Sequence, residues 1–121
     1  MKKLALILLI GFASVKTFAQ TTIAAKDAAK HIGEEVTITD KIYGGKFLAG
    51  PGLTLLDVGG AHPNESLVLL IKGDDRKKFT GNPEETLKGK SVTITGKIID
   101  YKGKPEIVIT ETAQIKVTET K

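Results

Sequence analysis

The chain has 121 residues, a length that suits a single domain. It contains no cysteine, which excludes a disulfide framework, a thiol nucleophile and a zinc site with cysteine ligands. The formal net charge is +4, but three of the lysines lie in an N-terminal segment that we expect to be removed. The remaining net charge of about +1 weakens the case for a polyanionic partner.

The N-terminal residues 1–19 have the pattern of a secretory signal peptide. Lys2 and Lys3 are followed by an almost wholly apolar run over 4–15, which is too short for a membrane-spanning helix of roughly 20 apolar residues. Thr17 and Ala19 place small residues before a cleavage site. We therefore expect a soluble domain of residues 20–121, beginning at Gln20, that is exported to the periplasm or secreted.

A short helix is predicted at the start of this domain. Thr22 is a typical N-cap residue, and apolar residues follow with helical spacing from Ala25 to Ile32. Gly33 then ends the helix, as glycine commonly does after the last helical residue. The helix is rich in alanine, so we expect it to lie on the rest of the domain rather than to form a core.

From Glu35 onward, apolar and polar residues alternate, which predicts β-strands. Gly44 and Gly45 are predicted to end the first strand and to open a flexible loop over 44–52. The polar segment 72–88 is predicted to hold two helical turns, at 74–79 and 83–88. The predicted strands are 35–42, 53–58, 67–71 (buried on both sides), 91–100 and 106–110, with a short final strand at 114–117. The side chains expected to face the core are Val36, Ile38, Leu55, Leu69, Val92, Ile94, Ile107 and Ile109.

The sequence contains one internal echo. Residues 33–42, GEEVTITDKI, match residues 89–98, GKSVTITGKI. Two copies are too few for a repeat protein, which needs at least about three units. We interpret the echo as two strands with similar structural roles, each entered from a glycine that ends a helix.

Three segments carry a resemblance to a known family: GEEVTITDKI, GKSVTITGKIIDYKGKPEIVI and the closing AQIKV. With them, residues 23–117 resemble the exported bacterial OB-fold proteins that are often described as nucleic-acid-binding or DNA-binding. The resemblance implies a mainly β fold, a five-stranded Greek-key barrel with a short N-terminal helix and a helical connection between strands three and four. It also implies that strands one and four are neighbours, and that ligands bind on strands two and three between two flanking loops.

These two loops contain the candidate ligand-binding residues. Single-stranded nucleic acid is bound by aromatic rings that stack on bases and by cations that contact phosphates. The residues expected to do so are Tyr43, Phe47, Lys41 and Lys46 at the first loop, and Tyr101, Lys102 and Lys104 at the last hairpin turn. In the alternative interpretation, Phe47 packs into the barrel mouth, the tyrosines cover its rim and the lysines are solvated.

No residue pattern indicates an enzyme. Arg76 is the single arginine, whereas nucleases that resemble the staphylococcal type need more than one around the cleaved phosphate. His31 and His62 lie in different elements without the spacing of metal ligands, and we expect neither a metal ion nor a cofactor. The run from Arg76 to Lys78 is interpreted as a solvated turn.

Two functions remain open. The first is a non-enzymatic exported OB-fold binding module for single-stranded nucleic acid or another oligomeric ligand. The second is an envelope module that binds a protein or a small ligand and no nucleic acid. The oligomeric state is not predicted.

Overall fold

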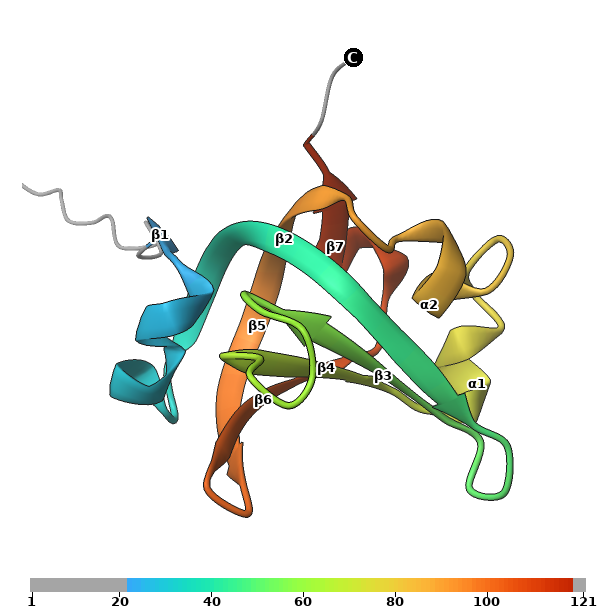
Figure 1. Cartoon of the computed structure of the whole chain (residues 1–121), viewed down its shortest axis with the longest axis horizontal. Coiled ribbons are helices and arrows are strands. Elements are labelled where there is room, and N and C mark those ends of the chain that lie inside the picture. The colour runs from blue at the N-terminus through green and yellow to red at the C-terminus, as the bar shows by residue number, and fades with distance from the viewer. Residues whose placement is uncertain (1–21, 119–121) are drawn as a thin grey trace, which may run out of the picture.

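The computed structural model describes residues 22–118 (Figure 1). The predicted signal peptide, its cleavage site and Gln20 lie outside these residues. No helix among the described residues is long and apolar enough to span a membrane.

Seven strands form one sheet in the order β1–β2–β3–β4–β6–β5–β7, and an additional pairing between β2 and β5 closes five of them into a ring. Ring neighbours are antiparallel except for β4 and β6, which are parallel. The prediction of a mainly β domain is confirmed, but the sheet has seven strands rather than five. The strands are β1 (Thr22–Ile23), β2 (Glu35–Leu48), β3 (Leu53–Val58), β4 (Leu67–Ile71), β5 (Ser91–Tyr101), β6 (Lys104–Ile109) and β7 (Ile115–Val117).

The two echoing segments are the strands that close the ring. They run antiparallel, and Ile38 is the partner of Ile94 at the centre of the pairing. At the ends, the amide of Gly33 donates to the carbonyl of Ile98 at 2.6 Å, and the amide of Gly89 donates to the carbonyl of Ile42 at 2.7 Å. Gly33 corresponds to Gly89 and Ile42 to Ile98 in the echo, so the two hydrogen bonds are equivalent and run in opposite directions between the strands. The two segments are therefore related by a local two-fold symmetry. The predicted adjacency of the two strands is confirmed.

The glycine pair in β2 bends the strand but does not end it, so the prediction of a loop over 44–52 is wrong. The register shifts between Ile42 and Gly44, where the strand leaves β5 and begins to pair with β3. A Cβ atom at Gly45 would collide with the carbonyl oxygen of Leu55. Glycine here therefore permits a close approach of two strands, and the connection to β3 shrinks to residues 49–52.

The core lies inside the ring and consists of aliphatic side chains. All the predicted core residues are buried except Leu55, which is half-buried and faces outward. The inward side chains of β3 are Thr54, Leu56 and Val58. The segment LTLLDV has leucines in both phases of a two-residue repeat, so its pattern did not identify the inward face. The side chains of β4 also alternate between buried and half-buried positions, so the prediction that this strand is buried on both sides is wrong.

The N-terminal helix differs from the prediction. Thr22 and Ile23 form β1, which pairs in parallel with β2, and a 3₁₀ helix covers Ala25–His31. Thr22 is therefore not its cap. Instead, the carboxylate of Asp40 on β2 accepts a hydrogen bond of 2.9 Å from the amide of Ala25. This bond ties the helix to the ring.

The polar segment after β4 contains both predicted helical turns, α1 (Gly73–Arg76) and α2 (Pro83–Thr86). They lie together at one end of the ring, and the 3₁₀ helix Ala25–His31 lies at the opposite end (Figure 1). A further 3₁₀ turn, Thr112–Gln114, precedes β7.

Candidate functional site

The structure separates the seven predicted site residues. Tyr43, Lys46 and Phe47 lie on β2, rather than in a loop as predicted. Lys46 is the register partner of Leu55, on the outer face of the ring. Phe47 is the partner of Thr54, whose side chain is buried, and therefore points to the other face.

The outer face of β3, β4 and β6 carries a groove, which we call the hairpin groove. It lies between the β2–β3 connection and the β5–β6 turn, which project downward on opposite sides in Figure 1. Three adjoining hollows of about 180, 270 and 180 Å³ make up the groove, and Leu55 lines all three. Leu55, which was predicted to face the core, thus lies at the centre of this surface.

One end of the groove is apolar. Its hollow is lined by Leu48, Leu53, Leu55 and Leu70, together with Tyr101 and Glu106. The four leucines are half-buried, and the ring of Tyr101 is 54% exposed. An apolar floor with an exposed ring can accept apolar side chains or the face of a planar group.

The middle hollow contains three of the predicted ligand residues. Tyr101, Lys102 and Lys104 line it together with Leu55, Glu65, Val68 and Glu106. The ammonium of Lys102 lies over the ring of Tyr101, 5.3 Å from its centroid. Lys104 donates to the main-chain carbonyl of Glu65 at 3.3 Å and lies 3.4 Å from its carboxylate. Both cations are therefore engaged within the protein.

The far hollow contains Lys46 and three groups that could ligate a metal ion. Asp57, His62 and Glu65 each offer a donor atom, and these atoms lie within 4.8 Å of one another. The side chain of Glu65 is only 5% exposed, and its Oε1 has no hydrogen-bond partner among the described residues. Lys46 and Lys104 place positive charge at the same hollow, which opposes a divalent cation there.

The pKa values of Asp57 and Glu65 are shifted in opposite directions. Burial, followed by the negative charge of Glu65, raises the pKa of Asp57. Burial also acts to raise the pKa of Glu65, but hydrogen bonds from its own amide, His62 and Lys104 outweigh that effect and lower it. The hydrogen bonds to Glu65 therefore favour the charged form of its carboxylate.

Tyr43 and Lys41 do not line the hairpin groove. Tyr43 lies at the bulge of β2 and is 41% exposed, and the ammonium of Lys41 lies 5.1 Å from its ring centroid. The rings of Tyr43, Phe47 and Tyr101 are each partly exposed. They nevertheless fail to form one stacking surface, because only Tyr101 lies in the groove.

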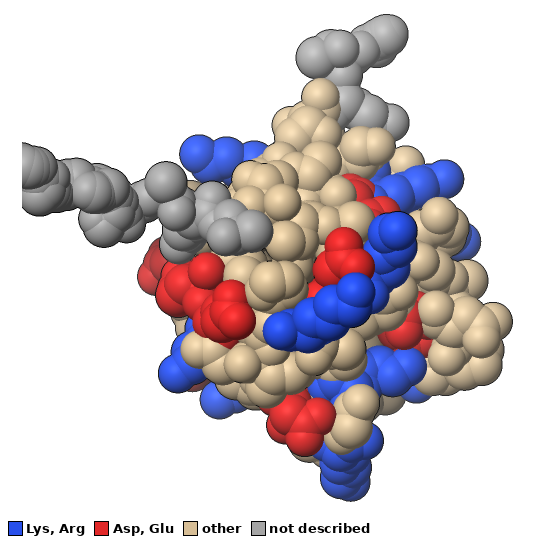
Figure 2. Space-filling view, turned by 90° about the vertical axis from the view of Figure 1, so that its left-hand side faces the viewer, with Lys and Arg blue, Asp and Glu red and all other residues tan. Residues whose placement is uncertain are grey.

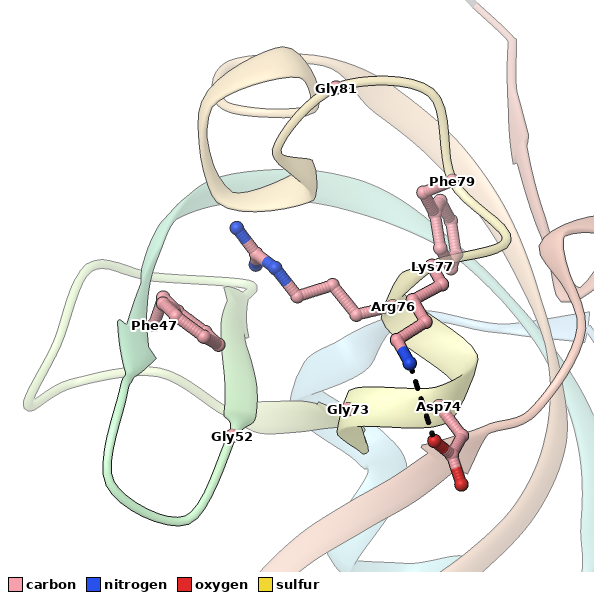
Figure 3. Close-up of a pocket in the computed structure, with 8 residues that line it drawn as sticks. All are labelled: Phe47, Gly52, Gly73, Asp74, Arg76, Lys77, Phe79 and Gly81. Atoms are coloured by element: carbon pink, nitrogen blue, oxygen red, sulfur yellow. Dashed lines mark ion pairs between the residues drawn. The ribbon is translucent and has the colours of Figure 1, made fainter.

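Phe47 instead lines a separate pocket of about 480 Å³ beside α1, with Arg76 and Phe79 (Figure 3). The guanidinium of Arg76 lies 4.0 Å from the Phe47 ring centroid. It also donates to the hydroxyl of Thr54 at 2.6 Å and to the carboxylate of Glu84 at 2.7 Å. Arg76 is therefore not part of a solvated turn, and its hydrogen-bonding groups are directed at the protein rather than at a ligand.

The surface charge is mixed where it can be seen. Figure 2 shows the side of the molecule with the 3₁₀ helix Ala25–His31, where lysines and acidic residues are interspersed. Where basic side chains adjoin one another on this face, acidic side chains lie beside them (Figure 2).

Four of the predicted residues, Lys46, Tyr101, Lys102 and Lys104, line the groove, but its acidic residues were not predicted from the sequence. Glu106 interrupts an otherwise apolar strand, KPEIVI, and this was an available signal. Glu65 precedes β4 in a polar turn, where nothing in the sequence predicts its burial.

Comparisons with known proteins inform the fold alone. No family model and no curated protein matches this sequence. Among solved structures, a putative aspartyl-tRNA synthetase from Leishmania major Friedlin matches 88% of this chain with a TM-score of 0.53 and 12% sequence identity. The matched region is 22% of the synthetase chain, so this protein corresponds to a small part of it.

Proposed function

We propose that this protein is a non-enzymatic, exported binding module of the OB type, and that an extended peptide segment of a partner protein binds in its hairpin groove. Five ring strands and a helical segment between the third and the fourth support the OB assignment. The groove crosses the second and third ring strands and lies between the two hairpin turns, as in OB-fold ligand sites.

One observation favours a peptide over a nucleic acid: carboxylates lie in the groove itself. Asp57, Glu65 and Glu106 line it alongside the leucines. A phosphate backbone in this groove would lie against these negative charges, whereas peptide side chains can match both apolar and charged positions. The elongated shape also suits a chain that passes from hollow to hollow.

Single-stranded nucleic acid is the second candidate. The exposed ring of Tyr101 and the neighbouring Lys102 and Lys104 provide one stacking surface and two cations. The likeness to a protein whose name refers to tRNA is compatible with this candidate. The single ring and the adjacent carboxylates argue against it.

Nuclear magnetic resonance titration of the exported protein distinguishes the two candidates. The probes are acetyl-Leu-Ser-Leu-Ser-Leu-amide and an oligothymidylate of about ten nucleotides at low salt, where electrostatic contacts are strongest. We expect the peptide to shift amide resonances of β3, β4 and β6, and the oligonucleotide to leave them unchanged. Groove shifts with the oligonucleotide alone would refute the peptide proposal.

Two matched variants locate the binding. Leu55→Lys places a charge at the centre of the groove and is expected to abolish peptide binding. Val117→Lys makes the same kind of change at an exposed apolar residue of β7, outside the groove, and is expected to leave binding intact. Equal loss in both variants would assign the peptide to another surface.

A further inference from the structure

Glu106 is an almost fully buried residue whose carboxylate has no partner among residues 22–118. It is 6% exposed, and among the described residues its side chain takes part in no hydrogen bond or ion pair. On β6 it is the register partner of Val68 on one side and of Ile99 on the other, so its strand neighbours are apolar. With Tyr101 and Leu55 it lines both the middle and the apolar hollow of the hairpin groove.

The charged groups nearby are engaged elsewhere. Lys104 contacts Glu65, and Lys102 lies over the ring of Tyr101. Burial alone raises the pKa of Glu106, and no neighbouring charge offsets that effect. A carboxylate that is largely withdrawn from water is stabilised by a cation that brings its own hydrogen-bond donors.

We propose that Glu106 and Tyr101 form a binding site for the guanidinium group of an arginine side chain in the bound peptide. This inference rests on the proposed function and specifies the chemistry of the ligand. The carboxylate accepts the guanidinium N–H groups, and the ring of Tyr101 offers a face on which the planar cation stacks. Leu55 and Leu70 provide an apolar surface for the aliphatic stem of the arginine.

Arginine fits this site better than the other cations. Its guanidinium is more weakly hydrated than an ammonium and pairs with a carboxylate through two parallel hydrogen bonds. A metal ion would need several oxygen or nitrogen ligands, and the apolar hollow provides only Glu106 and the hydroxyl of Tyr101.

The test compares two peptides that differ only in charge. Acetyl-Leu-Arg-Leu-amide and acetyl-Leu-citrulline-Leu-amide are titrated against the exported protein by nuclear magnetic resonance. Citrulline keeps the shape of arginine but has a neutral end group. We expect the arginine peptide to bind roughly tenfold more tightly, the size of one charge-assisted hydrogen bond.

Variants assign that preference to Glu106. Glu106→Gln is expected to reduce the arginine-to-citrulline affinity ratio to about one, and Tyr101→Leu to lower it partly. Glu85→Gln removes one negative charge from α2, outside the groove, and is expected to preserve the ratio. A ratio that survives in Glu106→Gln would overturn the assignment.

The outcomes separate this inference from the proposed function. Equal binding of both peptides to the unaltered protein would overturn the proposed arginine site but would still agree with peptide binding in the groove. Binding of neither peptide, together with groove shifts from oligothymidylate, overturns both. The comparison on the unaltered protein needs no variant to fold.

Discussion

Lys46 and Phe47 are adjacent in the chain and lie on opposite faces of β2. Lys46 borders the hairpin groove, whereas Phe47 packs beneath Arg76 at the end of the ring that carries α1. A cation and an aromatic ring that the sequence places side by side therefore serve two different surfaces. This separation follows from the extended conformation of β2, in which successive side chains alternate.

The two faces of β3 are expected to differ in stability effects. Leu56→Ala removes a fully buried side chain and should cost about 2–5 kcal/mol of unfolding free energy. Leu55→Ala lies in the half-exposed groove and should cost about 1 kcal/mol or less. Urea denaturation measures both values. Equal losses would show that the register of β3 is misassigned.

Gly45→Ala tests the bend in β2. The added Cβ would meet the backbone of β3, so we expect a loss of roughly 1–3 kcal/mol, as in other overpacked sites. Gly50→Ala is the matched control, because no atom lies within 4 Å of its added Cβ. That change should stay within about 0.5 kcal/mol in the same denaturation experiment. A tolerated alanine at Gly45 would contradict the close approach.

Arg76→Met removes the donors to Thr54 and Glu84 and should cost about 1–3 kcal/mol at neutral pH. The hydrogen bond from Arg76 lowers the pKa of Glu84 below its usual 4.5, so this stabilisation is present above pH 4.5. It is lost as the pH falls through the lowered pKa. The difference in stability between the two proteins should therefore shrink in acid to the contribution of the Thr54 hydrogen bond, and Lys77→Met, at an exposed neighbour, serves as the control.

Glu106→Gln should become more stabilising, relative to the unaltered protein, as the pH rises above 4.5. Burial raises the pKa of Glu106 in the folded state above its usual 4.5, so the unaltered protein loses stability as the pH rises through that raised pKa. Glutamine does not titrate. Thermal denaturation across this pH range, with Glu85→Gln correcting for the loss of one negative charge, measures the difference. A flat difference would mean that the groove does not penalise the charged form.

The predicted signal peptide gives a direct mass measurement. Thr17 and Ala19 have small side chains at the spacing of a signal-peptidase site, so the mature protein should begin at Gln20. Intact mass spectrometry of the exported protein checks this. A mature form that retains residues 1–19 would contradict it.

The strand bounds 53–58 and 67–71 were predictable because each is a short apolar run between turn residues. The inward phase of β3 was not predictable, since Leu55 and Leu56 are equally apolar and only the partner strands distinguish them. Gly44 and Gly45 were interpreted as the end of a strand because a tight contact between strands leaves no trace in the sequence of either one. Within the site, the Tyr101 hairpin was predictable from its turn. The burial of Glu65 and Glu106 was not predictable, because it depends on β3, β4 and β6, which come together only in the folded ring.

The two-fold pairing of β2 with β5 has a consequence for self-recognition. Residues 36–39 and 92–95 have the same sequence, VTIT, and pair with each other in antiparallel orientation. A VTIT segment can thus pair with another VTIT segment. Every unfolded chain exposes two such segments, which can pair with those of another unfolded chain. Intramolecular closure has the advantage only while chains are dilute. We expect refolding at rising protein concentration to yield homotypic dimers through this segment, observable by size-exclusion chromatography, whereas in the folded chain the segment is already paired within the closed ring.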